Sequence, residues 1–517
     1  MLTRFIRSLG MVMLLAMTAL SVRAQSSAET SVRIAIGLEA ARAGSGRLLL
    51  FARKIDPVAK EPITSVDVSQ FGYKNEFVAA REVTGLIAGQ RLRFDATDLA
   101  FPVSLNRLPS GAYWMQALLD SDHSYAYSGR GGGDVVSEVV RVTLPLNGSV
   151  PTLTLSTTLP MPGLWEYPSV GPMFKPEEAA TVNARIKPFF FTSPALSAFM
   201  GRPIQMRGLV LTPEGYDRGK ERYPVVYFTQ GFTATMTFLA DAAHAVMGYT
   251  HDGRLPPMIW VFLDESGPTG THEFADSVNN GPWGKALTAE LIPDIERHYR
   301  TDRTAAGRFV MGHSSGGWAA LWLQIHYPKM FGGAWATAPD FCDFTHFWGA
   351  DITQPGGLMT AVSWQPVEEV LGEYGGQMAS FEWVFSPRGP DGRPMRLYDR
   401  TTLVIDPQVA AYWRQNWDLS QIIRSRWAEL APDLDGKVRV IVGDKDEAGL
   451  DDSARRLHAA FQAVGGRATF TYLPGKGHFN LYSEGAERMA LRRKIAWQMW
   501  RVARPKSKLT DPGPPHP

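Results

Sequence analysis

The segment from Arg308 to Ala320 holds a serine in a context that predicts covalent catalysis. A short apolar run leads into the pattern Gly-His-Ser-Ser-Gly at residues 312–316, and residues that favour a helix follow. This order is typical of a strand, a tight turn and a helix, in which the turn strains the serine backbone and lifts its hydroxyl above the sheet. Gly312 and Gly316 leave room for the strand and the helix to approach each other. The five residues alone also suit an ordinary turn, but the flanking strand and helix patterns favour Ser314 as a nucleophile.

A serine hydroxyl is a poor nucleophile at its own pKa, so a histidine must accept its proton and a carboxylate must orient that histidine. In a fold of this kind the acid and then the histidine follow the serine along the chain. His478 lies in a glycine-rich loop directly after the last predicted strand and is the predicted base. His326 and His458 lie on predicted helices and cannot easily turn back to the serine. His346, within a long insertion, remains the alternative.

The acid should come from the loop after the strand that ends at Val442, which reads Gly-Asp-Lys-Asp-Glu. Asp446 stands far enough beyond the strand to reach across the sheet, whereas Asp444 is typical of a residue that caps a turn. Asp446 is therefore the predicted acid, and Asp444 is the alternative. A calcium-binding loop could also start at Asp444, but Ala448 and Arg455 occupy two positions that should supply ligands.

Two backbone N–H groups must stabilise the oxyanion of a tetrahedral intermediate. One belongs to Ser315, the residue after the nucleophile. The other is predicted at Phe232, because residues 224–228 form a buried strand that leads into Gln230 and Gly231. Gly231 could also be an ordinary turn glycine.

Residues 32–158 contain short strand-like runs between turn signals and predict an all-β, sandwich-like domain. Within it, Val139–Leu146 and Val150–Leu155 flank Asn147-Gly148, a dipeptide that favours a two-residue hairpin turn. The glycines at 129 and 131–133 do not lie between a strand and a helix. They indicate a mobile loop rather than a phosphate-binding one.

Strands alternate with helices from residue 201 to 503, which predicts a mostly parallel sheet of the α/β class. The Pro-rich stretch 159–200 is predicted to be a linker packed on its neighbours, and 504–517 a disordered tail. Residues from about 340 to 435 interrupt the alternation and are rich in tryptophan. This insertion is either a cap over the site or a lobe whose tryptophans form its own core.

Residues 1–24 contain basic residues, an apolar run and a small-residue ending, which is typical of a cleaved secretory signal peptide. The run is shorter than the ~20 residues that a membrane-spanning helix needs, so a membrane anchor is the weaker interpretation. Loss of the three arginines in this segment lowers the formal charge from +2 to −1, and the charge pattern does not indicate nucleic acid. Cys342 is the one cysteine, so the fold is held without disulfides, which a bacterial periplasm permits for a protein of this size.

With these residues in place, the α/β part resembles the putative-esterase family of α/β hydrolases, which includes enterochelin esterases, esterase D, feruloyl esterases and mycolyltransferases. The resemblance covers about residues 195–500. It rests on the segments Arg202–Asp217, Tyr223–Gly231, Glu290–Arg300 and Gly312–Gly317. Residues 274–284 and 381–387 resemble a secreted bacterial branch with an N-terminal β domain.

The resemblance implies ester hydrolysis by a Ser-Asp-His triad, carried here by Ser314, Asp446 and His478. The sequence departs from the family at Gln230, where histidine is usual. We therefore expect a secreted or periplasmic serine esterase that needs no cofactor or metal and acts on a small-molecule or glycan-linked ester. An acyltransferase with the same triad and a catalytically inert glycan-binding protein remain open. We expect no nucleic-acid partner and no integral membrane segment after signal cleavage, and the oligomeric state is left open.

Overall fold

The computed structural model describes residues 30–56, 63–69, 71–167 and 171–514. The predicted signal peptide, 1–24, lies outside these residues. Within the part of the chain that is described, no helix is both long and apolar enough to cross a membrane.

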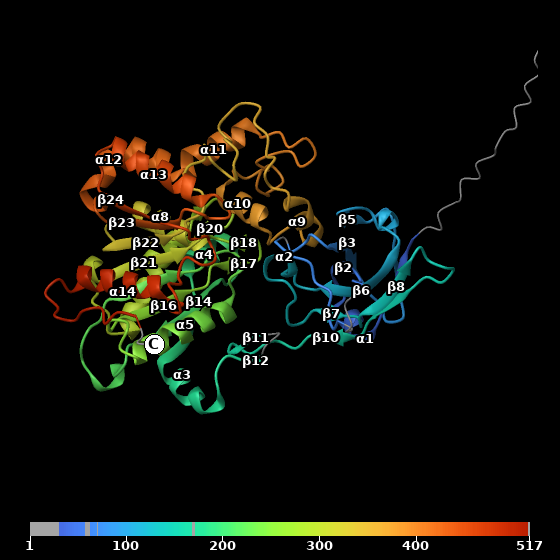
Figure 1. Cartoon of the computed structure of the whole chain (residues 1–517), viewed down its shortest axis with the longest axis horizontal. Helices are drawn as coiled ribbons and strands as arrows, with labels where there is room; N and C mark the ends of the chain where they lie inside the picture. The colour runs from blue at the N-terminus through green and yellow to red at the C-terminus, as the bar shows by residue number, and fades with distance from the viewer. Residues whose placement is uncertain (1–29, 57–62, 70, 168–170, 515–517) are drawn as a thin grey trace, which may run out of the picture.

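An eight-stranded sheet forms the centre of the larger part of the molecule (Figure 1). In spatial order its strands are β13 (Ile186–Thr192), β14 (Gln205–Leu211), β16 (Ile259–Leu263), β15 (Val225–Thr229), β21 (Arg308–His313), β22 (Gly333–Thr337), β23 (Val438–Gly443) and β24 (Ala468–Leu473). The pairs β13–β14 and β14–β16 are antiparallel, and all pairs from β16 to β24 are parallel. The carboxyl ends of the parallel strands therefore meet along one edge, where α/β sheets usually bind ligands.

Helices cover both faces of this sheet because its central strands are apolar on both sides. In β15, Val226 and Phe228 lie in one core with α5 (Met236–His251), and Tyr227 lies in the opposite core with residues of α7 (Ile292–His298). The other helices of this part outside the insertion are α3 (Ala179–Arg185), α4 (Pro194–Met200), α6 (Trp283–Ala286), α8 (Ser315–His326), α13 (Leu450–Ala463) and α14 (Ala490–Ala503). Three short strand pairs are β11 (Glu166–Tyr167) with β12 (Gly171–Pro172), β17 (Ser266–Gly267) with β18 (Gly270–Thr271), and β19 (Asp276–Ser277) with β20 (Gly281–Pro282).

Two further sheets share one core in the N-terminal part, to which Ile34 and Leu50 both contribute. The smaller sheet has the order β4 (Arg91–Phe94), β1 (Val32–Ile36) and β9 (Thr152–Leu155). The larger has the order β10 (Thr157–Thr158), β7 (Val135–Val136), β6 (Gly111–Asp120), β2 (Ser45–Lys54), β3 (Glu76–Thr84) and β5 (Leu99–Phe101), and β8 (Val140–Leu144) also pairs with β6. Two short helices, α1 (Leu38–Ala43) and α2 (Tyr125–Ser128), accompany the strands, so this part is not wholly β.

The hairpin predicted around Asn147-Gly148 is wrong. β8 is antiparallel to β6, with Leu144 opposite Gly111, whereas β9 is parallel to β1, with Leu153 opposite Ile34. Both strands bury leucines in the core between the two sheets. The Asn-Gly turn therefore joins two sheets, because burial of both apolar faces outweighs the local preference for a hairpin.

Two predicted boundaries are also corrected. The second half of the predicted linker 159–200 belongs to the large sheet, since β13 pairs with β14 from Ile186 to Thr192. The predicted tail 504–517 is ordered as far as it is described: Arg504 binds Asp302 at 2.7 Å, and Asp511 is paired with Arg493. Charged side chains hold a segment whose composition alone favours disorder.

The insertion lies between β22 and β23. It contains α9 (Gln365–Leu371), α10 (Gln377–Phe385), α11 (Pro407–Trp417) and α12 (Leu419–Leu434). Trp413 and Trp417 are buried, and the Trp417 ring lies 4.7 Å from that of Trp322 on α8. These tryptophans belong to a core rather than to an open cap. Trp364 instead faces the N-terminal part, where its ring lies 6.3 Å from that of Phe71.

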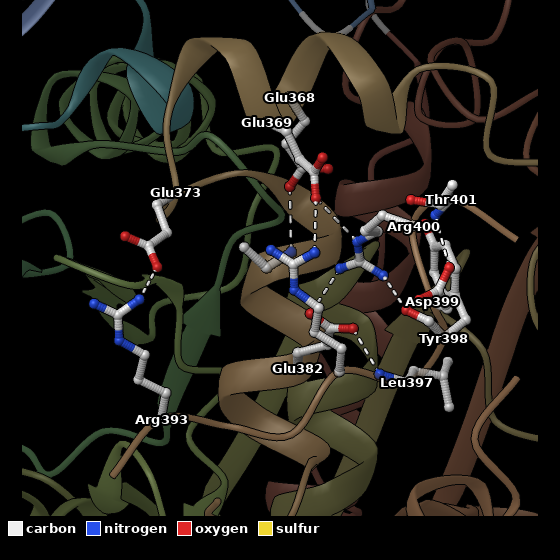
Figure 2. A network of polar contacts seen from close by, with 12 residues as sticks. Glu368, Glu369, Glu373, Glu382, Arg393, Leu397, Tyr398, Asp399, Arg400 and Thr401 are labelled. Atoms are coloured by element: carbon white, nitrogen blue, oxygen red, sulfur yellow. Dashed lines mark hydrogen bonds and ion pairs between the residues drawn. The ribbon is translucent and has the colours of Figure 1, made fainter. Parts of the chain in front are cut away.

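Charged side chains fix the insertion internally and to the N-terminal part. Arg400 binds Glu369 at 3.3 Å and Glu382 at 2.8 Å, which ties α9 to α10 (Figure 2). Arg47 of β2 donates from Nε to the carbonyl oxygen of Val370 at 2.9 Å. The N-terminal part and the insertion are therefore held together by a buried guanidinium as well as by apolar side chains of α9.

Candidate active site

Ser314 lies on the tight turn between β21 and α8. Its φ of +58° and ψ of −126° fall in a region that residues other than glycine rarely adopt, and such strain is common at functional sites. A Cβ atom on Gly312 would lie 1.9 Å from the carbonyl oxygen of Gly316, and one on Gly316 would lie 2.6 Å from that of Thr229. Neither position can therefore carry a side chain, because the backbone of β21 touches that of α8 at Gly312 and the backbone of α8 touches the end of β15 at Gly316. The turn is held by a hydrogen bond from Ser314 N to Thr337 O at 3.0 Å.

The loop after β15 lies directly against the serine. A Cβ atom on Gly231 would lie 2.9 Å from Ser314 Cβ, so the loop has no room for a side chain at this position. The backbone N–H groups of Phe232 and Ser315 donate no hydrogen bond to any other described residue. Ser315 follows Ser314 and Phe232 follows Gly231 in the chain, and two free N–H donors on these two loops are the kind of groups that an oxyanion requires.

The ends of β23 and β24 bring the predicted acid and the predicted histidine together. Asp446 Oδ2 lies 2.9 Å from His478 Nδ1, and the Asp446 side chain is fully buried. Glu447 Oε2 accepts a hydrogen bond from the backbone N–H of His478 at 2.6 Å. The His478 ring lies 4.6 Å from the ring of His313, the residue before Ser314. The histidine is thus held beside the turn that carries the serine.

Asp340, which no sequence motif indicated, also reaches the serine. Its Oδ1 accepts a hydrogen bond from the Ser314 hydroxyl at 3.2 Å, and its Oδ2 accepts one from the Ser315 hydroxyl at 2.6 Å. Asp340 follows β22, which pairs with β21 in parallel. A carboxylate just beyond the strand next to the serine strand is the signal that could have identified it.

Burial and neighbouring charges set the protonation of these groups. Burial lowers the pKa of His478, but the hydrogen bond and charge of Asp446, together with the charge of Asp340, outweigh it and raise this pKa above 6.5. Burial, with the charge of His478, lowers the pKa of His313 to about 3. Burial raises the pKa of Asp340 to about 6, although the hydrogen bond from Ser315 and the charge of His478 oppose the shift. Of the two neighbouring histidines, His478 is the one suited to exchange protons near neutral pH.

The residues that sequence reasoning left as alternatives have other partners. The Nδ1 atom of His346 lies 3.1 Å from Oδ2 of Asp452. Asp444 accepts a hydrogen bond from the backbone N–H of Gly475 at 2.7 Å, as expected of a residue that fixes a turn. Neither side chain has Ser314 among its partners.

Among the described residues, one group of three carboxylates could approach a metal ion, namely Asp120, Asp122 and Asp134 in the N-terminal part. Asp120 already accepts hydrogen bonds from the backbone N–H groups of Ser124 and Tyr125, both at 3.1 Å. Since backbone donors satisfy this carboxylate, the geometry gives no specific reason to place a cation there.

A serine on a strand–turn–helix, a later histidine–aspartate pair and a carboxyl edge of parallel strands together define an α/β protein with the layout of α/β hydrolases. The family model described as Putative esterase matches residues 197–463, just over half of the chain. The chain belongs to this family.

Curated relatives match over short segments. Iron(III) enterobactin esterase from Dickeya dadantii (strain 3937) is 31% identical over 124 residues, which is 23% of this chain and 28% of that protein. Endo-1,4-beta-xylanase/feruloyl esterase from Xylanibacter ruminicola is 31% identical over 132 residues, which is 24% of this chain and 18% of that protein. The chain thus spans less than a third of the length of each of these two relatives.

Solved structures that are similar include a ferulic acid esterase, with a TM-score of 0.40, 15% identity and coverage of 62% of this chain and 98% of that chain. An S-formylglutathione hydrolase from Agrobacterium tumefaciens has a TM-score of 0.39, 16% identity and coverage of 61% and 95%.

Proposed function

We propose that the protein is a serine esterase that hydrolyses carboxylic esters through an acyl-enzyme. The observation that carries this proposal is the buried Asp446–His478 pair beside a serine on a strained turn. The names of the curated relatives, an enterobactin esterase and a xylanase/feruloyl esterase, agree with an ester as the substrate.

Each residue has a defined chemical task in this proposal. His478 accepts the proton of the Ser314 hydroxyl as the oxygen attacks the ester carbonyl, and Asp446 holds the imidazole in the required tautomer. The N–H groups of Phe232 and Ser315 stabilise the oxyanion. His478 then gives the proton to the leaving alkoxide, and a water molecule, activated by the same histidine, releases the acid from Ser314.

Asp340 holds the Ser314 hydroxyl before the reaction begins. The hydrogen bond between them directs the proton toward a carboxylate and not toward the imidazole. The hydroxyl must rotate toward His478 once the substrate is bound. We infer that Asp340 positions the nucleophile and that its charge contributes to the raised pKa of His478.

The burial of two tryptophans supports hydrolysis over transfer to an alcohol. A cap that excludes water needs apolar side chains over the site, whereas Trp413 and Trp417 pack against α8 and the core of the insertion.

The decisive experiment uses purified protein without residues 1–24. We expect hydrolysis of short p-nitrophenyl esters, and in Ser314→Ala a loss of at least roughly a thousandfold in kcat. Ser425→Ala, which changes an exposed serine on α12, should keep full activity. A fluorophosphonate probe should label the wild type at Ser314. Equal turnover in wild type and Ser314→Ala would refute the proposal.

We also propose export by the N-terminal segment. Residues 1–24 have the composition of a signal peptide. Mass spectrometry of the protein recovered from a bacterial periplasm or medium should give an N-terminus at Gln25. Recovery only of an uncleaved cytoplasmic chain would contradict this.

A further inference from the structure

Aromatic rings from three separate segments meet at the loop that carries Phe232. The Phe232 ring lies 6.4 Å from that of Phe71 and 5.2 Å from that of Tyr127, both edge to face. Trp364 of the insertion lies 6.3 Å from Phe71. We call Phe71, Tyr127, Phe232 and Trp364 the aromatic wall. Two of its four members come from the N-terminal part, which meets the insertion near α2 and α9 (Figure 1).

One member of the aromatic wall, Phe232, lies next to the candidate active site. Phe232 directly follows Gly231, whose Cα is so close to Ser314 that an added Cβ would lie 2.9 Å from the serine Cβ. The hydroxyl of Tyr127 donates to the carbonyl oxygen of Ala234 at 3.0 Å, two residues beyond Phe232. The N-terminal part therefore contacts the same loop that offers an oxyanion donor.

Phe71 is the exposed member of the aromatic wall, and it packs against rings that are less exposed. Tyr127 and Trp364 are buried, whereas Phe71 is 60% exposed. An exposed ring contributes little to folding, since it removes little apolar surface from water. Its contacts with Phe232 and Trp364 instead hold the ring in place and leave part of its surface free to stack on an aromatic ligand.

The sheet order indicates which half of an ester would reach this face. The Phe232 loop follows β15 on one side of β21, whereas Asp446 and His478 follow β23 and β24 on the other side. The histidine must protonate the leaving oxygen, so the leaving group belongs on its side. Phe479, 89% exposed and next to His478, lies there. We therefore expect the acyl group to extend toward the aromatic wall.

We propose that the N-terminal part completes the substrate site, with Phe71 binding an aromatic ring carried by the acyl group of the ester. This inference rests on the proposed esterase function and adds the class of acyl group and the residue that selects it. Tyr127 is a positioning residue in this arrangement, because it holds the Phe232 loop through Ala234.

The test compares two esters that share a leaving group, p-nitrophenyl acetate and p-nitrophenyl phenylacetate. Phe71→Ala should lower kcat/KM for the phenylacetate about tenfold, the effect expected from loss of one ring contact and its buried area, and leave the acetate within about twofold. Phe71→Leu should lie between wild type and Phe71→Ala. Phe190→Ala is the matched control, since Phe190 is also 60% exposed but lies on the edge strand β13.

Tyr127→Phe tests the positioning role separately from ring binding, because it removes only the hydroxyl that donates to the Ala234 carbonyl oxygen. It should lower kcat for both esters by the same factor, as expected of a residue that acts through the oxyanion loop. Melting temperatures of all variants identify any that fail to fold.

The possible results separate this inference from the proposed function. The acyl subsite would be overturned, while the esterase function stands, if Phe71→Ala lost equal activity with both esters or lost none with either. The same conclusion would follow if Phe190→Ala changed the selectivity between the esters as Phe71→Ala does. Hydrolysis of neither ester by the wild type would overturn the function, and the subsite with it.

Discussion

Asp446 and Asp340 stand beyond the carboxyl ends of neighbouring strands, β23 and β22, and both are buried, yet they bind different groups. Asp446 contacts His478 at 2.9 Å, whereas Asp340 accepts the hydroxyl of Ser314 at 3.2 Å. β22 is adjacent to the serine strand and β23 is one strand further away. The comparison shows that position along the sheet edge decides which reacting group a carboxylate serves. Substitutions at Asp446, Asp340 and Asp444 test that division.

Asp446→Asn should have the largest effect. The amide favours the wrong tautomer of His478, which costs ~10⁴ in kcat where an aspartate has this role. The melting temperature should change little by comparison, because the amide retains the oxygen that accepts from the Ala448 N–H at 3.0 Å. Steady-state kinetics and thermal unfolding on the same preparation check both. Residual activity near that of the wild type would remove Asp446 from the site.

Asp340→Asn should cost less than about a hundredfold in kcat, the range of one charge-assisted hydrogen bond. The amide oxygen can still accept the Ser314 hydroxyl, so the nucleophile stays in place. The comparison needs both variants measured with one ester. If Asp340→Asn matched or exceeded Asp446→Asn, the division of roles between the two carboxylates would be reversed.

The pH profile tests whether the charge of Asp340 acts on His478. The reaction needs neutral His478, and its pKa is raised, so kcat/KM of the wild type should rise with pH through an apparent pKa above 6.5. Asp340 contributes to that increase through its negative charge. In Asp340→Asn the imidazolium is less stabilised, and the acid limb should move to lower pH. An unmoved limb would show that Asp340 does not influence the protonation of His478.

Asp444→Asn should have the smallest effect. Asp444 accepts the backbone N–H of Gly475 at 2.7 Å, and weakening this bond should lower the free energy of unfolding by about 1 kcal/mol while kcat stays within about threefold. Urea unfolding together with turnover checks the two quantities. A large loss of turnover at unchanged stability would identify Asp444, not Asp446, as the acid.

Local patterns predicted the elements whose cause is local. The turn at Ser314 could be recognised because Gly312 and Gly316 are required by backbone contacts within a few residues of it or with the adjacent strand. The same kind of reasoning failed at Asn147-Gly148, where the turn signal was present but the flanking strands pair in different sheets. A turn preference is weaker than burial of two apolar strand faces.

The α/β character of residues 201–503 and the order of Ser314, Asp446 and His478 could be predicted, because strand and helix periodicity and the turn glycines are visible in neighbouring residues. The hydrogen bond from the Ser314 hydroxyl to Asp340 and the contact of Phe71 with Phe232 could not. Both depend on which strands lie side by side and on how the N-terminal sheets meet the insertion, and such long-range packing leaves no short-range pattern in the chain.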